Sequence, residues 1–335
     1  MTVPAPCSAS SEAVLQISDL NVAFRAGSGW LPVVRGIDMS VERGRVLVLL
    51  GESGSGKSVT LRAVVGLLQQ EGARVSGQVK VEGDDVTAMS QREVLELRGK
   101  RVGFIFQEPM TALDPVFRIG DQIAETIVRH RGATWKEAQA RAKQLFDLVQ
   151  IPSAERRLRA YPSELSGGLR QRAMIAMAMS CEPQLLLADE PTTALDATVQ
   201  IQVLLLLREI QKELGTAMVF VTHDLGVAAE IADDVAVMYA GRIVEKGSAE
   251  QVLLASRHPY TQALTSCVVR GSYRDLALGE LSGSPPDLSQ LPPGCSFAPR
   301  CSQRVDECGR VDPLGSECHP RHMVSCVKVE AYAGL

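Results

Sequence analysis

The sequence predicts an α/β fold in which a parallel β-sheet carries helices on its faces, followed by a small, loop-rich C-terminal segment. Three observations support this prediction. Apolar runs of strand length alternate with longer stretches that are apolar at helical spacing. A glycine-rich motif lies between one such strand and the helix that follows it. Cysteines crowd the part of the chain after residue 294.

Composition narrows the class of protein. The chain has 335 residues, enough for one large core plus an appendage. A net charge of -4 and only 4% aromatic residues argue against a nucleic-acid partner, so we expect none. No apolar run approaches the ~20 residues needed to span a bilayer, and the N-terminus lacks the features of a signal peptide. We therefore expect a cytosolic chain, in whose reducing environment clustered cysteines suggest a metal site and not disulfides.

The first third of the chain is rich in strand patterns. Residues 14–24 and 33–41 alternate as half-buried strands do, and Gly27, Ser28 and Gly29 form a turn between them. Residues 45–50 are apolar at every position after Arg45, as expected of a central parallel strand. A helix is expected over 59–68. Further strands are expected over 75–81 and 102–106.

The rest of the chain changes from helices to an alternating pattern. Between 114 and 165 the pattern is helical, with Pro152 closing the second of two amphipathic helices. Strand and helix then alternate, which adds to the parallel sheet. The expected helices are 119–129, 134–149, 197–214 and 225–232, and the expected strands are 185–188, 217–221, 235–239 and 242–246, the last two as a hairpin. A linker over 271–293 precedes the tail, and the absence of an internal repeat predicts one nucleotide domain.

Residues 51–58, GESGSGKS, fit the phosphate-binding pattern GxxxxGK[ST] at every fixed position. Glycines let backbone N–H groups curl round phosphates, and the following helix adds its positive end. Lys57 is expected to reach the β- and γ-phosphates, and Ser58 to bind Mg²⁺. The residues expected to hold ATP here are Gly51, Ser53, Gly54, Ser55, Gly56, Lys57, Ser58 and Val59.

Two acids follow the apolar strand over 185–188. The carboxyl end of such a strand is where α/β sheets place their ligands. We expect Asp189 to hold Mg²⁺ through water and Glu190 to act as the general base that polarises the attacking water.

Residues 165–171, LSGGLRQ, resemble the signature of ABC ATPases. Three other family motifs stand in the family's order along the chain, with Gln107 before the signature as the Q-loop glutamine, and residues 194–196 as the D-loop and His223 as the switch histidine after it. The resemblance implies a P-loop NTPase of the ABC ATPase type over residues 12–250. Such a domain has a parallel-sheet core, an antiparallel β subdomain and an α-helical subdomain at about 110–165.

The same resemblance implies a mechanism. Two such domains sandwich two ATP molecules head to tail, and Ser166, Gly167 and Gly168 of one domain touch the γ-phosphate held by the other. His223 senses the γ-phosphate, while Gln107 touches Mg²⁺ and links ATP to the membrane partner. Two positions depart from the family, Leu169 in the signature and Ala26 where an aromatic residue stacks on adenine. Phe24 and Trp30 are open alternatives for the stacking residue.

The tail resembles the C-terminal extension of oligopeptide and dipeptide importer ATPases. The similar stretches are 258–264 (HPYTQAL), 284–288 (SPPDL) and 291–301 (LPPGCSFAPRC), so the extension is expected over 251–335. In that group the segment is similar to an iron–sulfur binding segment, here with Cys295, Cys301, Cys308 and Cys326 as ligands. Ligand chemistry alone leaves a [4Fe-4S] cluster, zinc and a metal-free tail open, and Cys318 and His322 are spare candidates.

The resemblance implies an ATPase subunit that energises import of dipeptides or oligopeptides from the cytoplasmic face of the inner membrane. Its implied partners are two transmembrane permease subunits, an extracytoplasmic solute-binding protein and a second, homologous ATPase in a heterodimer. Nickel, glutathione or another small solute is the alternative cargo. A soluble ABC ATPase acting on ribosomes or DNA is the competing class, but such proteins usually carry two cassettes or a coiled-coil insertion. A hydrolysis-dead module is disfavoured because Lys57, Glu190 and His223 are all present.

Overall fold

The computed structural model describes residues 13–27, 29–69, 71–193, 195–266 and 283–329. Ser28 of the expected turn, Ala194 and much of the expected linker lie outside the described residues.

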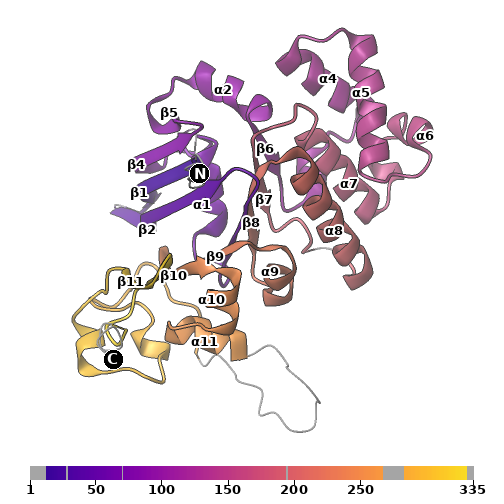
Figure 1. Ribbon diagram of the computed structural model, residues 1–335. Helices are drawn as coiled ribbons and strands as arrows, with labels where there is room; N and C mark the ends of the chain where they lie inside the picture. Colours follow the sequence, from indigo (N-terminus) through magenta and orange to yellow (C-terminus); the bar gives the residue numbers. More distant parts are fainter. Residues whose placement is uncertain (1–12, 28, 70, 194, 267–282, 330–335) are drawn as a thin grey trace, which may run out of the picture.

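The core of the molecule is a mixed eight-stranded sheet (Figure 1). Its five strands β9, β3, β8, β7 and β6 are parallel to one another, while β10, β12 and β11 add an antiparallel edge. In spatial order the strands are β11 (Ser316–His319), β12 (His322–Val324), β10 (Arg242–Ser248), β9 (Asp234–Tyr239), β3 (Val46–Leu50), β8 (Ala217–Thr222), β7 (Leu185–Asp189) and β6 (Val102–Ile105).

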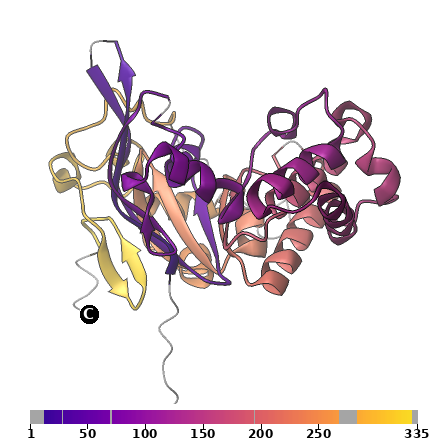
Figure 2. The ribbon, with the colours of Figure 1, turned by 90° about the horizontal axis from the view of Figure 1, so that it is seen from above.

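A second, antiparallel sheet packs beside the first at the N-terminal side of the molecule (Figure 2). Its long pair β1–β2 is interrupted by bulges, and Asp19 takes a φ of 45° at one of them. In spatial order its strands are β2 (Gly29–Glu42), β1 (Ala13–Ala26), β4 (Arg74–Val81) and β5 (Asp84–Asp85). The expected antiparallel β subdomain is therefore present.

Helices form a separate lobe on the far side of the main sheet (Figures 1 and 2). The lobe follows β6 and contains α3 (Pro109–Ala112), α4 (Ile119–Arg131), α5 (Trp135–Leu148), α6 (Ala154–Leu158) and α7 (Gly167–Ala178). The remaining helices are α1 (Lys57–Val64), α2 (Gln91–Lys100), α8 (Ala197–Leu214), α9 (Leu225–Ile231), α10 (Ala249–Leu254) and α11 (Pro259–Ser266).

The five parallel strands of the main sheet each divide their side chains between two cores. On β3, Val46, Val48 and Leu50 pack with the helical lobe, whereas Leu47 and Leu49 pack with the antiparallel sheet. All five are buried, and each such side chain stabilises the fold by ~1.5–3 kcal/mol relative to exposure. This double burial is why the strand reads as a continuous apolar run.

Helix ends follow local chemistry. Thr134 and Glu137 form a capping box at the start of α5, and Asp196 caps α8 through the backbone N–H of Val199. Gly215 ends α8 with a φ of 62°. Helix α8 therefore has the bounds expected from the sequence.

The structure also differs from the sequence expectations, for example in three places. Helix α1 begins at Lys57 and ends at Val64, not at 59 and 68, because the chain enters the helix from Gly56 and turns at Gly66, whose φ is 62°. Helix α2 was not expected, because most of its residues are polar. The tail, expected to be loop-rich, contains the hairpin β11–β12, which pairs with β10 and extends the main sheet.

A buried carboxylate holds the tail against the sheet. Glu245 on β10 is fully buried and accepts hydrogen bonds from the backbone N–H groups of Arg257 and His258, at 2.7 and 3.0 Å. The ring Nε2 of His322 on β12 lies 2.8 Å from the same carboxylate. The ring Nδ1 of His258 accepts the backbone N–H of Tyr260 at 3.1 Å. Three segments therefore meet at one acidic side chain.

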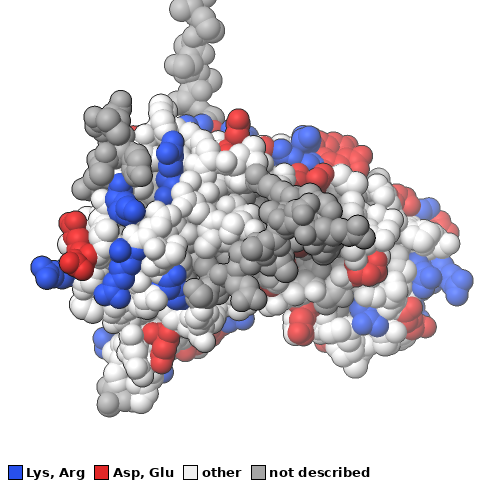
Figure 3. Space-filling view, turned by 90° about the horizontal axis from the view of Figure 1, so that it is seen from below, with Lys and Arg blue, Asp and Glu red and all other residues white. Residues whose placement is uncertain are grey.

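The surface of the protein carries both acidic and basic side chains. Both signs occur across the face shown in Figure 3, with several Lys and Arg side chains gathered toward one side of it. Within the described residues, every helix is too short or too polar to serve as a bilayer span.

The buried ring of His258 predicts that acid destabilises the protein. Burial lowers its pKa from 6.5 to about 4, so the folded chain binds fewer protons than the unfolded chain below pH 6.5. The stability from this group is complete above pH 6.5 and is lost as the pH falls toward 4, by about 3 kcal/mol in total. Urea unfolding between pH 7.5 and 4.5 measures it.

The matched variant is His258→Asn, whose side-chain oxygen can still accept from Tyr260 but does not titrate here. Its unfolding free energy should fall less over the same pH range. Equal slopes for the two proteins would contradict this assignment.

Candidate functional site

The motif residues meet at one edge of the main sheet. Strands β3, β6, β7 and β8 are parallel, so their carboxyl ends lie side by side, where such sheets bind ligands. The residues that follow or end these strands are the phosphate loop 51–56, Gln107, Asp189, Glu190 and His223.

Two positions of the phosphate loop, Gly51 and Gly56, have no room for a side chain. Gly56 has a φ of 104°, and a Cβ there would lie 2.9 Å from the backbone oxygen of Val33 and 2.7 Å from Cε of Met238. A Cβ on Gly51 would lie 2.3 Å from the backbone oxygen of Met238. No side chain caps the first turn of α1, so its backbone N–H groups are free to bind an anion.

Lys57 is held inside this loop. Its side chain is 4% exposed, and Nζ donates to the backbone oxygens of Gly51 and Glu52 at 2.8 and 2.9 Å. Nζ also lies 3.9 Å from Oε1 of Glu190. Burial lowers the pKa of Lys57, and the nearby carboxylates of Glu190, Asp189 and Glu52 oppose that fall. The ammonium group is thus desolvated but kept charged by its neighbours.

Ser58 and Asp189 present two oxygen atoms side by side. The Ser58 hydroxyl donates to Oδ1 of Asp189 at 2.8 Å. Burial raises the pKa of Asp189, and the hydrogen bond from Ser58 opposes that rise. A hydroxyl and a carboxylate at this spacing are the hard oxygen ligands that Mg²⁺ prefers. The expected magnesium-binding pair is therefore brought together.

Glu190 is the point where the remaining motifs converge. Its Oε2 lies 3.2 Å from Nδ1 of His223 and accepts from Gln107 Nε2 at 3.5 Å and from Thr193 Oγ1 at 3.0 Å. Its φ of 44° is a strained backbone conformation for a glutamate. Thr193 was missed in the sequence, although its position three residues after Glu190 in a turn was a usable signal.

The signature motif does not join this cluster within the chain. Ser166 precedes α7, and its hydroxyl makes no capping hydrogen bond. Gly168 packs against α8, where an added Cβ would lie 2.7 Å from Cγ1 of Val199. Among the described residues, no hydrogen bond or ion pair links Ser166, Gly167 or Gly168 to Lys57 or Glu190. Their contact with a phosphate held by a second domain stays a prediction.

The residue that stacks on adenine also stays open. Trp30 at the end of the β1–β2 pair is 37% exposed, and the Arg74 guanidinium lies 3.9 Å from its ring centre. Phe24 is partly buried against the antiparallel-sheet core.

Cys308 lies within electrostatic reach of three other cysteines of the tail. Burial raises the pKa values of Cys295, Cys301 and Cys326, and each of these thiols has Cys308 as a charged neighbour that raises its pKa further. Cys318 has no cysteine among its charged neighbours. This separates the four expected ligands from Cys318, while the other spare candidate, His322, has its ring Nε2 against Glu245.

Backbone amides oppose those rises. The N–H groups of Phe297, Gln303 and Lys328, each two residues after a cysteine, bind the sulfurs of Cys295, Cys301 and Cys326. Such amides also stabilise metal-bound thiolates. Nevertheless, no three His, Cys, Asp or Glu side chains among the described residues are arranged to hold a metal ion.

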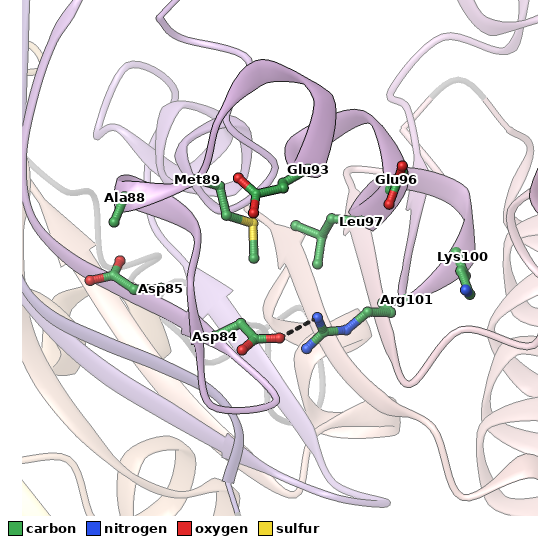
Figure 4. A pocket seen from close by; sticks show the side chains of 9 residues that line it. All are labelled: Asp84, Asp85, Ala88, Met89, Glu93, Glu96, Leu97, Lys100 and Arg101. Carbon is green, nitrogen blue, oxygen red and sulfur yellow. Dashed lines mark hydrogen bonds and ion pairs between the residues drawn. The ribbon is translucent and has the colours of Figure 1, made fainter.

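One surface pocket of about 530 Å³ lies away from the motifs, between β5 and α2 (Figure 4). Its carboxylates already have partners: Asp84 binds Arg101 at 2.6 Å, Asp85 binds Thr87, and Glu93 caps α2. The carboxylates that line this pocket are therefore explained by contacts within the protein, and we assign them no ligand.

Two known protein families match parts of this chain. The ABC transporter family matches residues 34–193, and the C-terminal region of oligopeptide/dipeptide transporters matches residues 244–308.

Two curated relatives are similar over almost their whole length. A dipeptide transport ATP-binding protein, DppD of Bacillus subtilis, is 42% identical over 94% of this chain and 94% of its own. An oligopeptide transport ATP-binding protein, OppD of Salmonella typhimurium, is 42% identical over 94% of this chain and 93% of its own.

Among solved structures, the dimeric ATP-binding cassette MJ0796 bound to ADP and Pi is similar, with a TM-score of 0.63 and 25% identity. The match covers 70% of this chain and 98% of that one. The α/β fold expected from the sequence is therefore confirmed.

Gly56→Ala is predicted to destabilise the chain by about 2–4 kcal/mol and to weaken ATP binding, because a Cβ meets backbone atoms in a left-handed conformation. Gly132→Ala is the control, since Gly132 has a φ of 66° with open space around it. We expect the control to lose about 1 kcal/mol and to bind ATP normally. Thermal melts and titration with a fluorescent ATP analogue measure both, and equal losses would contradict the steric argument.

Proposed function

Because this chain belongs to the family of oligopeptide and dipeptide ABC transporter ATP-binding subunits, we propose roles for the individual residues at its sheet edge. The chain is an ABC ATPase that hydrolyses ATP to drive peptide import. The observation that carries the residue roles is the convergence of Lys57, Gln107 and His223 on Glu190.

We propose that Glu190 is the general base. Its Oε2 accepts up to three hydrogen bonds that fix its direction, and the strained backbone at the strand end turns it toward the phosphate loop. His223 and Gln107 hold it. His223 senses the γ-phosphate, while Gln107 touches Mg²⁺ and links ATP to the membrane partner. Lys57, Ser58 and the loop amides bind the phosphates, and Ser58 and Asp189 hold Mg²⁺. When bound, Mg²⁺ neutralises charge that develops on the phosphate oxygens.

The signature motif is proposed to act across a pair of ATPase domains. Ser166, Gly167 and Gly168 lead into α7, and the N-terminus of a helix attracts phosphate. Because these residues stand apart from Lys57 in the chain, they fit a nucleotide held by a second subunit. That the partner is a related, non-identical ATPase is part of the proposal.

The membrane partners follow from the family. We propose a nucleotide-binding domain over 12–250 and an extension over 251–335, with the helical lobe contacting two permease subunits at the cytoplasmic face of the membrane. Met110, Val116 and Phe117 support this contact, because these large apolar side chains are exposed where the chain enters the lobe. The complete importer includes an extracytoplasmic peptide-binding protein.

We further propose that the tail holds a [4Fe-4S] cluster through Cys295, Cys301, Cys308 and Cys326. The electrostatic influence of Cys308 on the other three thiols and the amides that face those three sulfurs support it. The side chains are not drawn together into a metal-holding group, so binding requires the thiols to move closer. The cluster would fix a segment that has few apolar residues of its own.

Replacing the base tests the catalytic proposal. In Glu190→Gln the amide cannot take a proton, so we expect turnover to fall by at least 10²-fold while ATP binding persists. Steady-state phosphate release and binding of a fluorescent ATP analogue measure the two quantities. Glu213→Gln, an exposed change on α8, is the control. Unchanged turnover in Glu190→Gln would defeat the assignment.

Metal analysis of anaerobically purified protein tests the cluster. We expect about four irons per chain and iron–sulfur absorbance. Serine at any of the four proposed ligands should remove both signals, while Cys318→Ser should keep them. One zinc per chain without iron, or metal-free protein, would overturn the assignment.

A further inference from the structure

An arginine of the tail reaches the phosphate loop. Arg300 Nη1 and Nη2 bind the Glu52 carboxylate in a two-point ion pair at 2.7 and 3.0 Å. Glu52 is the second residue of the phosphate loop, and 248 residues separate it from Arg300. The Arg300 side chain is only 6% exposed and that of Glu52 is 25% exposed. A planar, two-point pair with little solvent access is the strong form of such an interaction.

A second contact fixes the same residue of the loop. The Glu52 backbone N–H donates to the hydroxyl of Tyr260 at 3.1 Å. Tyr260 lies on α11 and is fully buried, with its ring 4.6 Å from that of Tyr239 and 5.3 Å from that of Phe297. The Arg300 guanidinium lies 5.9 Å from the Tyr239 ring centre. The groups that hold Glu52 are thus held by a packed aromatic cluster.

The charge of Glu52 matters because of where it lies. Its backbone oxygen accepts Lys57 Nζ at 2.9 Å, and its carboxylate is among the charges that act on Lys57. A carboxylate beside this loop repels an incoming triphosphate and competes for the ammonium group. The two-point pair with Arg300 offsets that charge.

We propose that Arg300 and Tyr260 are positioning residues for nucleotide binding, through which the C-terminal extension holds the phosphate loop and neutralises Glu52. The proposal rests on the ATP site described above. The tail is then part of the nucleotide machinery.

A charge-cancellation cycle in the full-length chain tests the proposal. Arg300→Met leaves Glu52 uncompensated, so the Kd for Mg-ATP should rise about tenfold. The double variant Glu52→Gln with Arg300→Met removes both charges and should return Kd to within about threefold of the original. Arg304→Met is the control, because it changes another arginine of the same segment and should leave Kd unchanged. A fluorescent ATP analogue reports Kd, and thermal melts report folding.

Two further variants keep the outcome decisive. Tyr260→Phe removes only the hydroxyl that accepts the Glu52 N–H and should raise Kd about threefold, even if Arg300→Met fails to fold. Lys57→Ala should abolish binding and shows that the assay reads the phosphate loop. An unchanged Kd in Arg300→Met, or a double variant as weak as the single one, overturns the positioning role while the ATP site stands. An unchanged Kd in Lys57→Ala overturns the site itself.

Discussion

The site depends on one buried ammonium group. Lys57 is kept inside the phosphate loop by two backbone oxygens and by the carboxylate of Glu190. Burying a cation is unfavourable unless it is paired, so the loop, the strand end that carries Glu190 and the glycines that let the backbone close around Nζ must all be in place together. The other motif residues at the sheet edge lie around this positive charge, which is placed to bind a triphosphate.

The loop that holds this charge is itself held from a distance. Tyr260 and Arg300 stand 208 and 248 residues from Glu52 along the chain, yet both bind it. Arg300 directly precedes Cys301, so whatever fixes that cysteine also limits the freedom of the guanidinium. The extension therefore packs on the nucleotide domain through specific polar contacts as well as through aromatic packing.

Much of the fold and of the site could be predicted from the sequence, because the signals that identify them are local. The run at 45–50, the motif at 51–58 and the acids at 189 and 190 each carry their meaning in a few adjacent residues, and the structure brings Lys57, Ser58, Asp189 and Glu190 together as expected. The pairing of β12 with β10, the Glu245 network and the Arg300–Glu52 pair depend on contacts between distant segments. Short polar stretches such as 316–324 lack the periodicity that would have revealed them.

The pairing of β12 with β10 has a consequence for biosynthesis. Glu245 and its partner His322 are 77 residues apart, so β10 leaves the ribosome well before the strand that covers it. Until β12 is made, the growing chain exposes the unpaired edge of β10, and Glu245 lacks its partner His322. A translation product cut short in the tail keeps that edge open, which marks it for chaperones and proteases before it can enter an assembly.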